Sequence, residues 1–93
     1  MAQFTAYAAP MTYGPKVTIG SHGGEASFKI SFSVQGDTVV DGRVHYAKRG
    51  ADGKISESLV NGGTILTSNS FGNIEVDFKG SPLGSEIRIT VES

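Results

Sequence analysis

Two histidines are the residues best suited to chemistry in this chain, because imidazole is the side chain that most often titrates or binds metals near neutral pH. His22 follows Ser21 in a glycine-rich segment, and His45 lies in an alternating segment that predicts an outward-facing position. Neither an H-x-H nor an H-E-x-x-H spacing occurs, and a metal site needs at least three converging ligands. Adjacent side chains usually diverge, so Ser21 and His22 do not predict a nucleophile with its base. We interpret both histidines as ordinary surface residues.

The carboxylates show no catalytic spacing either. No D-x-D-x-D-G calcium loop and no glycine-rich phosphate loop is present, and the chain has no cysteine to act as a thiol nucleophile. A glycosidase needs two carboxylates facing each other across a cleft, and nothing singles out such a pair. We therefore expect no catalytic residues, no metal, no cofactor and no enzyme activity. The nine carboxylates are Glu25, Asp37, Asp41, Asp52, Glu57, Glu75, Asp77, Glu86 and Glu92.

Length and charge limit the classes of protein to which this chain could belong. A chain of 93 residues predicts one domain. Eight Lys and Arg against nine Asp and Glu give a net charge of −1, which argues against a dedicated nucleic-acid binder. No apolar run approaches the ~18 residues of a membrane span.

Period-two alternation is the strongest structural signal. Apolar and polar residues alternate over 28–34, 74–79 and 87–91, as expected for strands with one buried and one wet face. Further strands are predicted at 4–8 and 17–19. Glycine and proline separate these segments at the intervals typical of a sandwich, and no segment carries a capped helical stripe. The sequence predicts an all-β protein.

Two hairpins are predicted from opposed residues that share a face. In the first, Phe78 faces Ile87 on the apolar side while Asp77 faces Arg88 on the wet side. In the second, a three-residue loop over 35–37 places Phe32 opposite Val40, Phe28 opposite Val44, and keeps Asp41 outside.

A third hairpin is predicted at Asp52-Gly53, a pair that suits a type I′ turn. It sets Tyr46 opposite Leu59 and Lys48 opposite Glu57. A further hairpin at 61–63 accepts either a two- or a three-residue loop.

These elements predict a single small antiparallel β-sandwich of about seven or eight short strands. The short alternating strands, ending in Glu-Ile-Arg-Ile-Thr-Val-Glu-Ser, resemble immunoglobulin-like and jelly-roll modules as an architectural class. The Cys…Trp…Cys core of true immunoglobulin domains is missing. The resemblance implies an architecture and no function.

The first fifteen residues carry no charged side chain. They include the large apolar and aromatic residues Phe4, Tyr7, Met11 and Tyr13. We interpret residues 1–15 as an uncharged N-terminal strand or arm, and residues 16–93 as the β-sandwich core. One interpretation is a first strand of the same domain, followed by a proline-anchored crossover. The other is an assembly arm that adds a strand to a neighbouring copy.

Two functions remain as the main hypotheses, and a membrane-active β-toxin or inhibitor is the third. The leading one is a non-enzymatic structural or adhesive module that self-associates, or forms part of a surface, fibre or virion assembly, with itself or another protein as partner. The alternative is a module that binds a glycan or protein through its loops, with Tyr13, His22 and Phe71 as candidate contacts. The compartment stays open, and an extracellular, cell-surface or virion location is favoured over a cytoplasmic one.

Overall fold

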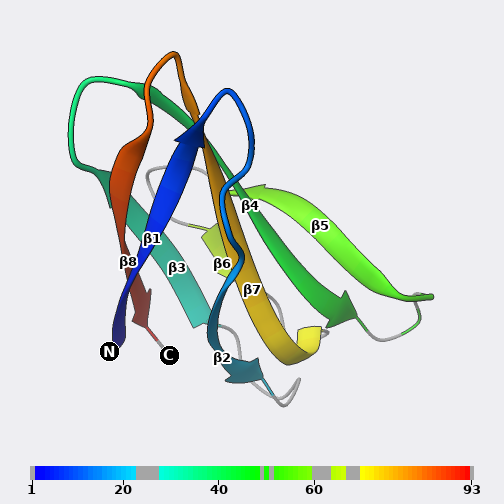
Figure 1. Cartoon of the computed structure of the whole chain (residues 1–93). Helices are drawn as coiled ribbons and strands as arrows, with labels where there is room; N and C mark the ends of the chain where they lie inside the picture. The colour runs from blue at the N-terminus through cyan, green and yellow to red at the C-terminus, as the bar shows by residue number, and fades with distance from the viewer. Residues whose placement is uncertain are drawn as a thin grey trace.

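The computed structural model is all-β, which confirms the predicted class (Figure 1). No helix that is long and apolar enough to cross a membrane is found among the described residues. The structure describes residues 2–22, 28–48, 50, 52–59, 64–66 and 70–92. The strands are β1 (Ala2–Pro10), β2 (Val17–His22), β3 (Phe28–Val34), β4 (Val39–Lys48), β5 (Lys54–Leu59), β6 (Thr64–Leu66), β7 (Ser70–Ser81) and β8 (Ser85–Glu92).

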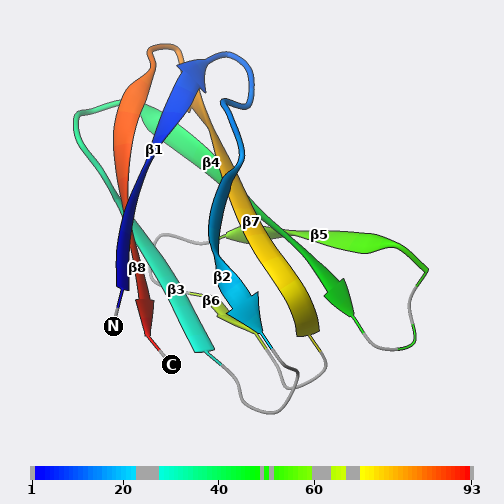
Figure 2. The ribbon, with the colours of Figure 1, turned by 60° about the horizontal axis from the view of Figure 1, so that its bottom comes forward.

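The strands form one curled mixed sheet, not the antiparallel sandwich that the sequence predicts. The order is β5-β4-β7-β1-β8-β3-β6, and β2 pairs with β7 beside this path. Strand β1 runs antiparallel to β8 over residues 2–8 and parallel to β7 at Ala9 and Pro10. Because β7 and β8 run in opposite directions, a strand placed between them must be parallel to one of them. The parallel pairing therefore follows from the insertion of β1 (Figure 2).

The predicted hairpin over 74–91 is wrong for the same reason. Phe78 of β7 pairs with Gly42 of β4, whereas Ile87 of β8 pairs with Ala6 of β1 and Val34 of β3. Both Phe78 and Ile87 are nevertheless buried, as the alternation predicts. The predicted buried faces of the two strands are confirmed, whereas their predicted pairing with each other is wrong.

The predicted pairing of 28–34 with 39–44 is also wrong. Phe32 of β3 lies opposite Ile89 of β8, and Val40 of β4 lies opposite Gly80 of β7. The segment 35–38 therefore connects β3 to β4, two strands that are not neighbours in the sheet.

Strands β4 and β5 do pair antiparallel, but Tyr46 faces Ile55 and Leu59 faces Gly42. This register differs from the predicted one by four residues, an even number that keeps every side chain on its expected face. Gly42 explains the preference, because a Cβ there would lie 2.8 Å from the Phe78 ring and 3.2 Å from Leu59 Cβ. The predicted hairpin at 61–63 lies outside the described residues.

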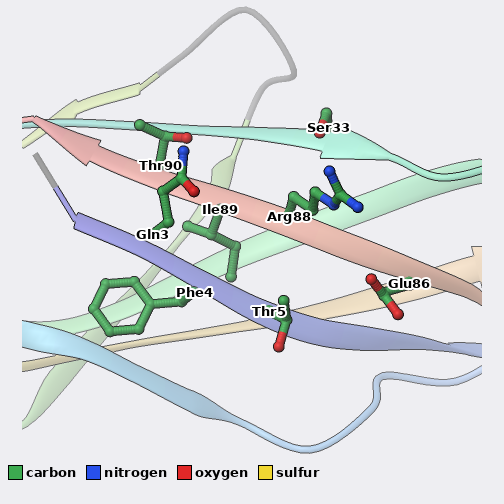
Figure 3. Close-up of a pocket in the computed structure, with 8 residues that line it drawn as sticks. All are labelled: Gln3, Phe4, Thr5, Ser33, Glu86, Arg88, Ile89 and Thr90. Atoms are coloured by element: carbon green, nitrogen blue, oxygen red, sulfur yellow. The ribbon is translucent and has the colours of Figure 1, made fainter.

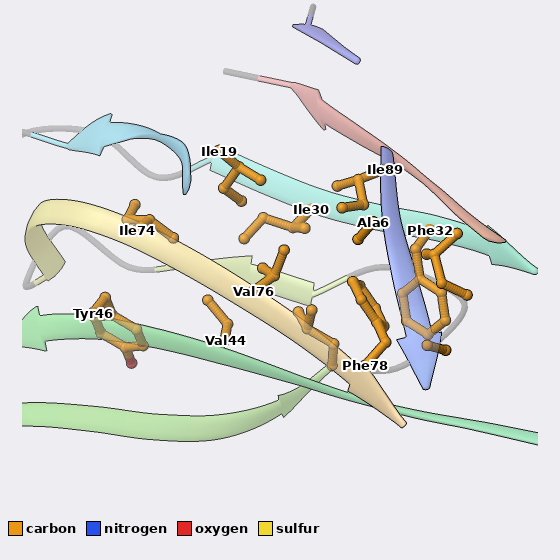
Figure 4. Close-up of a cluster of buried hydrophobic side chains, with 13 residues drawn as sticks. Ala6, Ile19, Ile30, Phe32, Val44, Tyr46, Ile74, Val76, Phe78 and Ile89 are labelled. Atoms are coloured by element: carbon orange, nitrogen blue, oxygen red, sulfur yellow. The ribbon is translucent and has the colours of Figure 1, made fainter. Parts of the chain in front are cut away.

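The hydrophobic core lies inside the curl, between the β3–β8 side and the β4–β7 side (Figure 4). Phe32 of β3 packs on Phe78 of β7, with ring centroids 4.9 Å apart and planes tilted by 60°. Ile30 and Ile89 face the core from the first side, and Val76 from the second. Residues far apart along the sheet thus meet in one core.

The uncharged N-terminal segment contributes a strand to its own chain's sheet. Ala6 and Ala8 of β1 are part of the core. Beyond β1 the chain stays attached to β7, because Met11 N donates to Gly80 O and Gly14 N donates to Phe78 O. The segment before residue 16 thus shares its core with the rest of the domain.

Candidate functional site

The three predicted ligand contacts do not gather at one place. Tyr13 forms a bridge with Lys79, whereas His22 pairs with Gly72, the neighbour of Phe71. Seven residues of extended strand separate these two points on β7, a span of ~23 Å. The side chains of His22 and Phe71 lie outside the described part of the structure. The Tyr13 ring lies beneath Arg43, whose guanidinium carbon is 3.5 Å from the ring centroid.

The four predicted arm residues divide into two groups. Phe4 packs against the core, and Tyr13 is half-buried under Arg43. Tyr7 and Met11 are open to solvent, with 51% and 68% of their surface exposed. Of these four residues, Tyr7 and Met11 are therefore the ones whose apolar surface is open to solvent.

These two residues belong to a larger exposed surface at one end of the sheet, here called the apical patch and made of Tyr7, Met11, Val39 and Leu83. Val39 and Leu83 are each 69% exposed. The four come from β1, the segment after it, the start of β4 and the turn between β7 and β8.

The turn after β7 holds the apical patch together. Ser81 pairs with Val39 and its Oγ lies 3.5 Å from Met11 Sδ. The Leu83 carbonyl accepts a hydrogen bond of 2.8 Å from Thr38 Oγ1, next to Val39. A Cβ built on Gly84 would collide with the Tyr7 hydroxyl, so this ring lies against the same turn. These pairings and contacts place the four residues around one turn.

A second feature, here called the polar cluster, consists of Arg43, His45, Ser56 and Asp77 on the face of β4, β5 and β7 opposite the core. The interpretation of His45 as an ordinary surface residue is wrong, because only 6% of it is exposed. Its Nε2 lies 2.9 Å from Asp77 Oδ1 and its Nδ1 lies 2.6 Å from Ser56 Oγ. His45 points away from the core, as predicted, and its neighbours on that face cover it.

Asp77 is the most deeply buried member of the polar cluster, at 2% exposure. Arg43 donates to both of its carboxylate oxygens, from Nε at 3.1 Å and Nη2 at 2.6 Å. Burial by itself raises the pKa of Asp77, but hydrogen bonds from Arg43 and His45 outweigh it and hold this pKa below its ordinary value. The bond to Asp77 in turn raises the pKa of Arg43. Asp77 is therefore a stable carboxylate inside the sheet.

The polar cluster is not predicted from the sequence, because the predicted strand partners are wrong. With β8 as the partner of β7, Asp77 faces Arg88 and has no connection with His45. In the structure Asp77 lies opposite Arg43, and His45 lies opposite Ser56. The alternation of Arg43 and His45 with core residues was the available signal, since it places both on one face. No group of three or more potential metal ligands is found in the ranges that the structure describes.

A third feature is an open depression of about 610 Å³ over β1, β3 and β8 (Figure 3). Its walls offer both hydrogen-bond donors and hydrogen-bond acceptors. The polar residues that line it include Arg88, Glu86, Ser33, Thr5 and Thr90. It contains none of the predicted loop contacts. Its only predicted site residue is Phe4, whose ring also packs against the core.

The comparisons with known proteins supply no functional precedent: no family model, no curated protein and no solved structure matches this chain. The function is accordingly inferred from the side chains themselves.

Proposed function

We propose that this protein is a structural or adhesive module that self-associates through its apical patch. The observation that carries the proposal is the gathering of Tyr7, Met11, Val39 and Leu83, each at least half exposed, around one turn. Exposed apolar side chains scattered singly are normal, whereas a contiguous group marks an interaction surface. Burying such a group against a partner removes apolar surface from water, which favours association.

The partner that we propose is a second copy of the chain. A net charge of −1 produces little repulsion between copies. Apolar side chains are also self-complementary, so that the same patch serves both partners across a twofold axis. Since the patch is small, a single contact is expected to be weak, and larger surface, fibre or virion assemblies require a second contact in addition.

Light scattering coupled to size-exclusion chromatography tests the proposal over a range of protein concentrations. The native chain is expected to shift from monomer to dimer as concentration rises. The double variant Val39→Asp/Leu83→Asp is expected to remain monomeric, because dimerisation would bury two carboxylates in each copy.

The matched control is Thr18→Asp/Asn73→Asp, two exposed positions on β2 and β7 outside the patch. Both double variants add two negative charges to the native net charge of −1 and reach −3. The control is expected to dimerise like the native chain. A native chain that is monomeric at every concentration, or a patch variant that dimerises normally, would contradict the proposal.

A further inference from the structure

A line of hydrogen-bonded side chains crosses the outer face of β5, β4 and β7. It begins at the hydroxyl of Ser56, passes through the imidazole of His45 and ends at the carboxylate of Asp77, with contacts of 2.6 and 2.9 Å. Ser56 is exposed, whereas the side chains of His45 and Asp77 are only 8% and 3% exposed. An exposed hydroxyl, a held imidazole and a buried carboxylate are the parts of an activated serine.

The hydrogen-bond donors in this line can be assigned from Asp77. Two hydrogen bonds from Arg43 and one from His45 keep the Asp77 carboxyl ionised, and an ionised carboxylate only accepts hydrogen bonds. His45 Nε2 must therefore carry the proton that it shares with Asp77. In the neutral ring this leaves the Nδ1 lone pair directed at Ser56, whose hydroxyl donates to it.

Strand pairing fixes this geometry. Ser56 and His45 are direct partners in the β4–β5 ladder, and His45 and Asp77 lie on adjacent strands of the β4–β7 ladder. Sites on strands are held more precisely than sites on loops. The centroid of the Tyr13 ring lies 3.5 Å from the guanidinium carbon of Arg43, and this contact restricts the group that orients Asp77.

We propose that Ser56 is an acyl-accepting nucleophile, with His45 as its general base and with Asp77 and Arg43 as positioning residues. This activity goes beyond self-association and uses a different part of the molecule. On β4, His45 is six residues from Val39 of the apical patch, a distance of ~20 Å along the strand.

The acceptor step is a single acyl transfer. Ser56 Oγ forms a bond to the carbonyl carbon of the acyl donor, the bond from that carbon to the leaving oxygen breaks, and the leaving group takes the electron pair. The Ser56 proton moves to His45 Nδ1, and Asp77 stabilises the resulting imidazolium. The proton then passes to the leaving group or to water.

The donors that fit are small activated esters, such as aryl esters. Ser56 lies on an exposed strand rather than in an enclosed pocket of the described structure, so binding energy is small and the donor itself must be reactive. The leaving group of an aryl ester departs as a stabilised phenolate. It therefore needs little protonation from the protein.

The test is acetylation of the full chain by p-nitrophenyl acetate, followed by mass spectrometry that locates the acetyl group. Ser56 is expected to be the serine that reacts fastest, and Ser56→Ala removes this product. Ser58→Ala is the matched control, because Ser58 is an exposed serine on the same face of β5, opposite Arg43 instead of His45. Loss of a general base predicts that His45→Gln slows acetylation of Ser56 by about 10²-fold or more.

Asp77→Asn tests whether Asp77 positions His45 or only fills space in the sheet. The asparagine has the same size as the aspartate, but it does not fix the tautomer of His45. A slower acetylation of Ser56 in a variant that circular dichroism shows to be folded is expected. Where His45→Gln or Asp77→Asn fails to fold, the comparison of native chain, Ser56→Ala and Ser58→Ala decides. Acetylation of Ser56 no faster than of Ser58, or at the native rate in a folded His45→Gln chain, overturns the proposal. Neither outcome bears on dimerisation through the apical patch.

Discussion

At the residue scale, the polar cluster shows how a small β protein holds a buried charge. A carboxylate with 2% exposure is costly unless it is paired and hydrogen-bonded, and Asp77 has three such bonds from two partners. Arg43 is itself 37% exposed, so it brings its charge to Asp77 without full burial of its own. The pair therefore avoids much of the desolvation cost that a fully buried ion pair carries.

Replacing Asp77 is expected to destabilise the fold. Asp77→Asn leaves the Arg43 donors poorly matched inside the sheet, and we expect the free energy of unfolding near pH 7 to fall by about 1–3 kcal/mol. Chemical denaturation measures this loss. Asp41→Asn is the control, because Asp41 is 62% exposed and its oxygen lies 3.8 Å from Lys79, so its loss is expected to stay within about 0.5 kcal/mol.

The same carboxylate predicts a pH dependence. Since the pKa of Asp77 is lower in the folded chain than in the unfolded chain, its contribution is complete above the unfolded pKa of about 3.9 and is lost as pH falls through the folded pKa. The native chain is therefore expected to lose more stability than Asp77→Asn between pH 4 and pH 2. Parallel stability curves for the two proteins would contradict this assignment.

At the element scale, β1 is the strand that determines the topology. It pairs with β8 along seven residues and reaches β7 at its end, so that it lies between these two strands in the sheet. The alternation of buried Ala6 and Ala8 with exposed Thr5 and Tyr7 shows that β1 has one core face. Ala6 and Ala8 on that face are part of the core, and Phe4 packs against it.

Substituting the same residue on opposite faces of β1 tests its placement. Ala8→Leu forces a larger side chain into a fully buried position and is expected to cost about 1–3 kcal/mol. Thr5→Leu, on the exposed face of the same strand, is expected to change stability by no more than about 0.5 kcal/mol. Thermal or chemical denaturation distinguishes them. Equal effects at the two positions would mean that β1 does not contribute a core face.

At the scale of the whole molecule, the curl of the sheet depends on contacts between strands that are not neighbours in it. The packing of Phe32 on Phe78 joins β3 to β7, which are separated in the sheet by β8 and β1. Burial of apolar surface on the inner face of the curl is what favours the curled form over a flat sheet. The outer face then carries the polar cluster.

A double-mutant cycle measures the contact between Phe32 and Phe78 across the curl. Phe32→Leu and Phe78→Leu are expected to show a coupling free energy of about 0.5–1.5 kcal/mol in chemical denaturation, because each substitution removes one of the two rings that contact each other. Phe32→Leu combined with Thr18→Ala, an exposed position on β2, is the control and is expected to show additive effects. Additivity of the two phenylalanine variants would mean that the rings do not interact across the curl.

The sequence by itself determined the strands and their faces. Period-two alternation is a local property, and burial of Phe78, Ile87 and Val76 follows from it whichever strands are paired. Even the register error between β4 and β5 left every face correct, because it was an even number of residues. The buried side of the chain could therefore be predicted without knowing the topology.

Only the tertiary structure decided which strands are partners. Pairing Phe78 with Ile87, or separating them by β1, buries the same two side chains, so local patterns cannot distinguish the two arrangements. The choice rests on contacts between distant segments: Ala6 and Ala8 in the core, Phe32 on Phe78, and the open space at Gly42 that Leu59 and Phe78 fill. The line from Ser56 through His45 to Asp77 joins three strands, and it exists because this nonlocal packing brings β5, β4 and β7 together in that order.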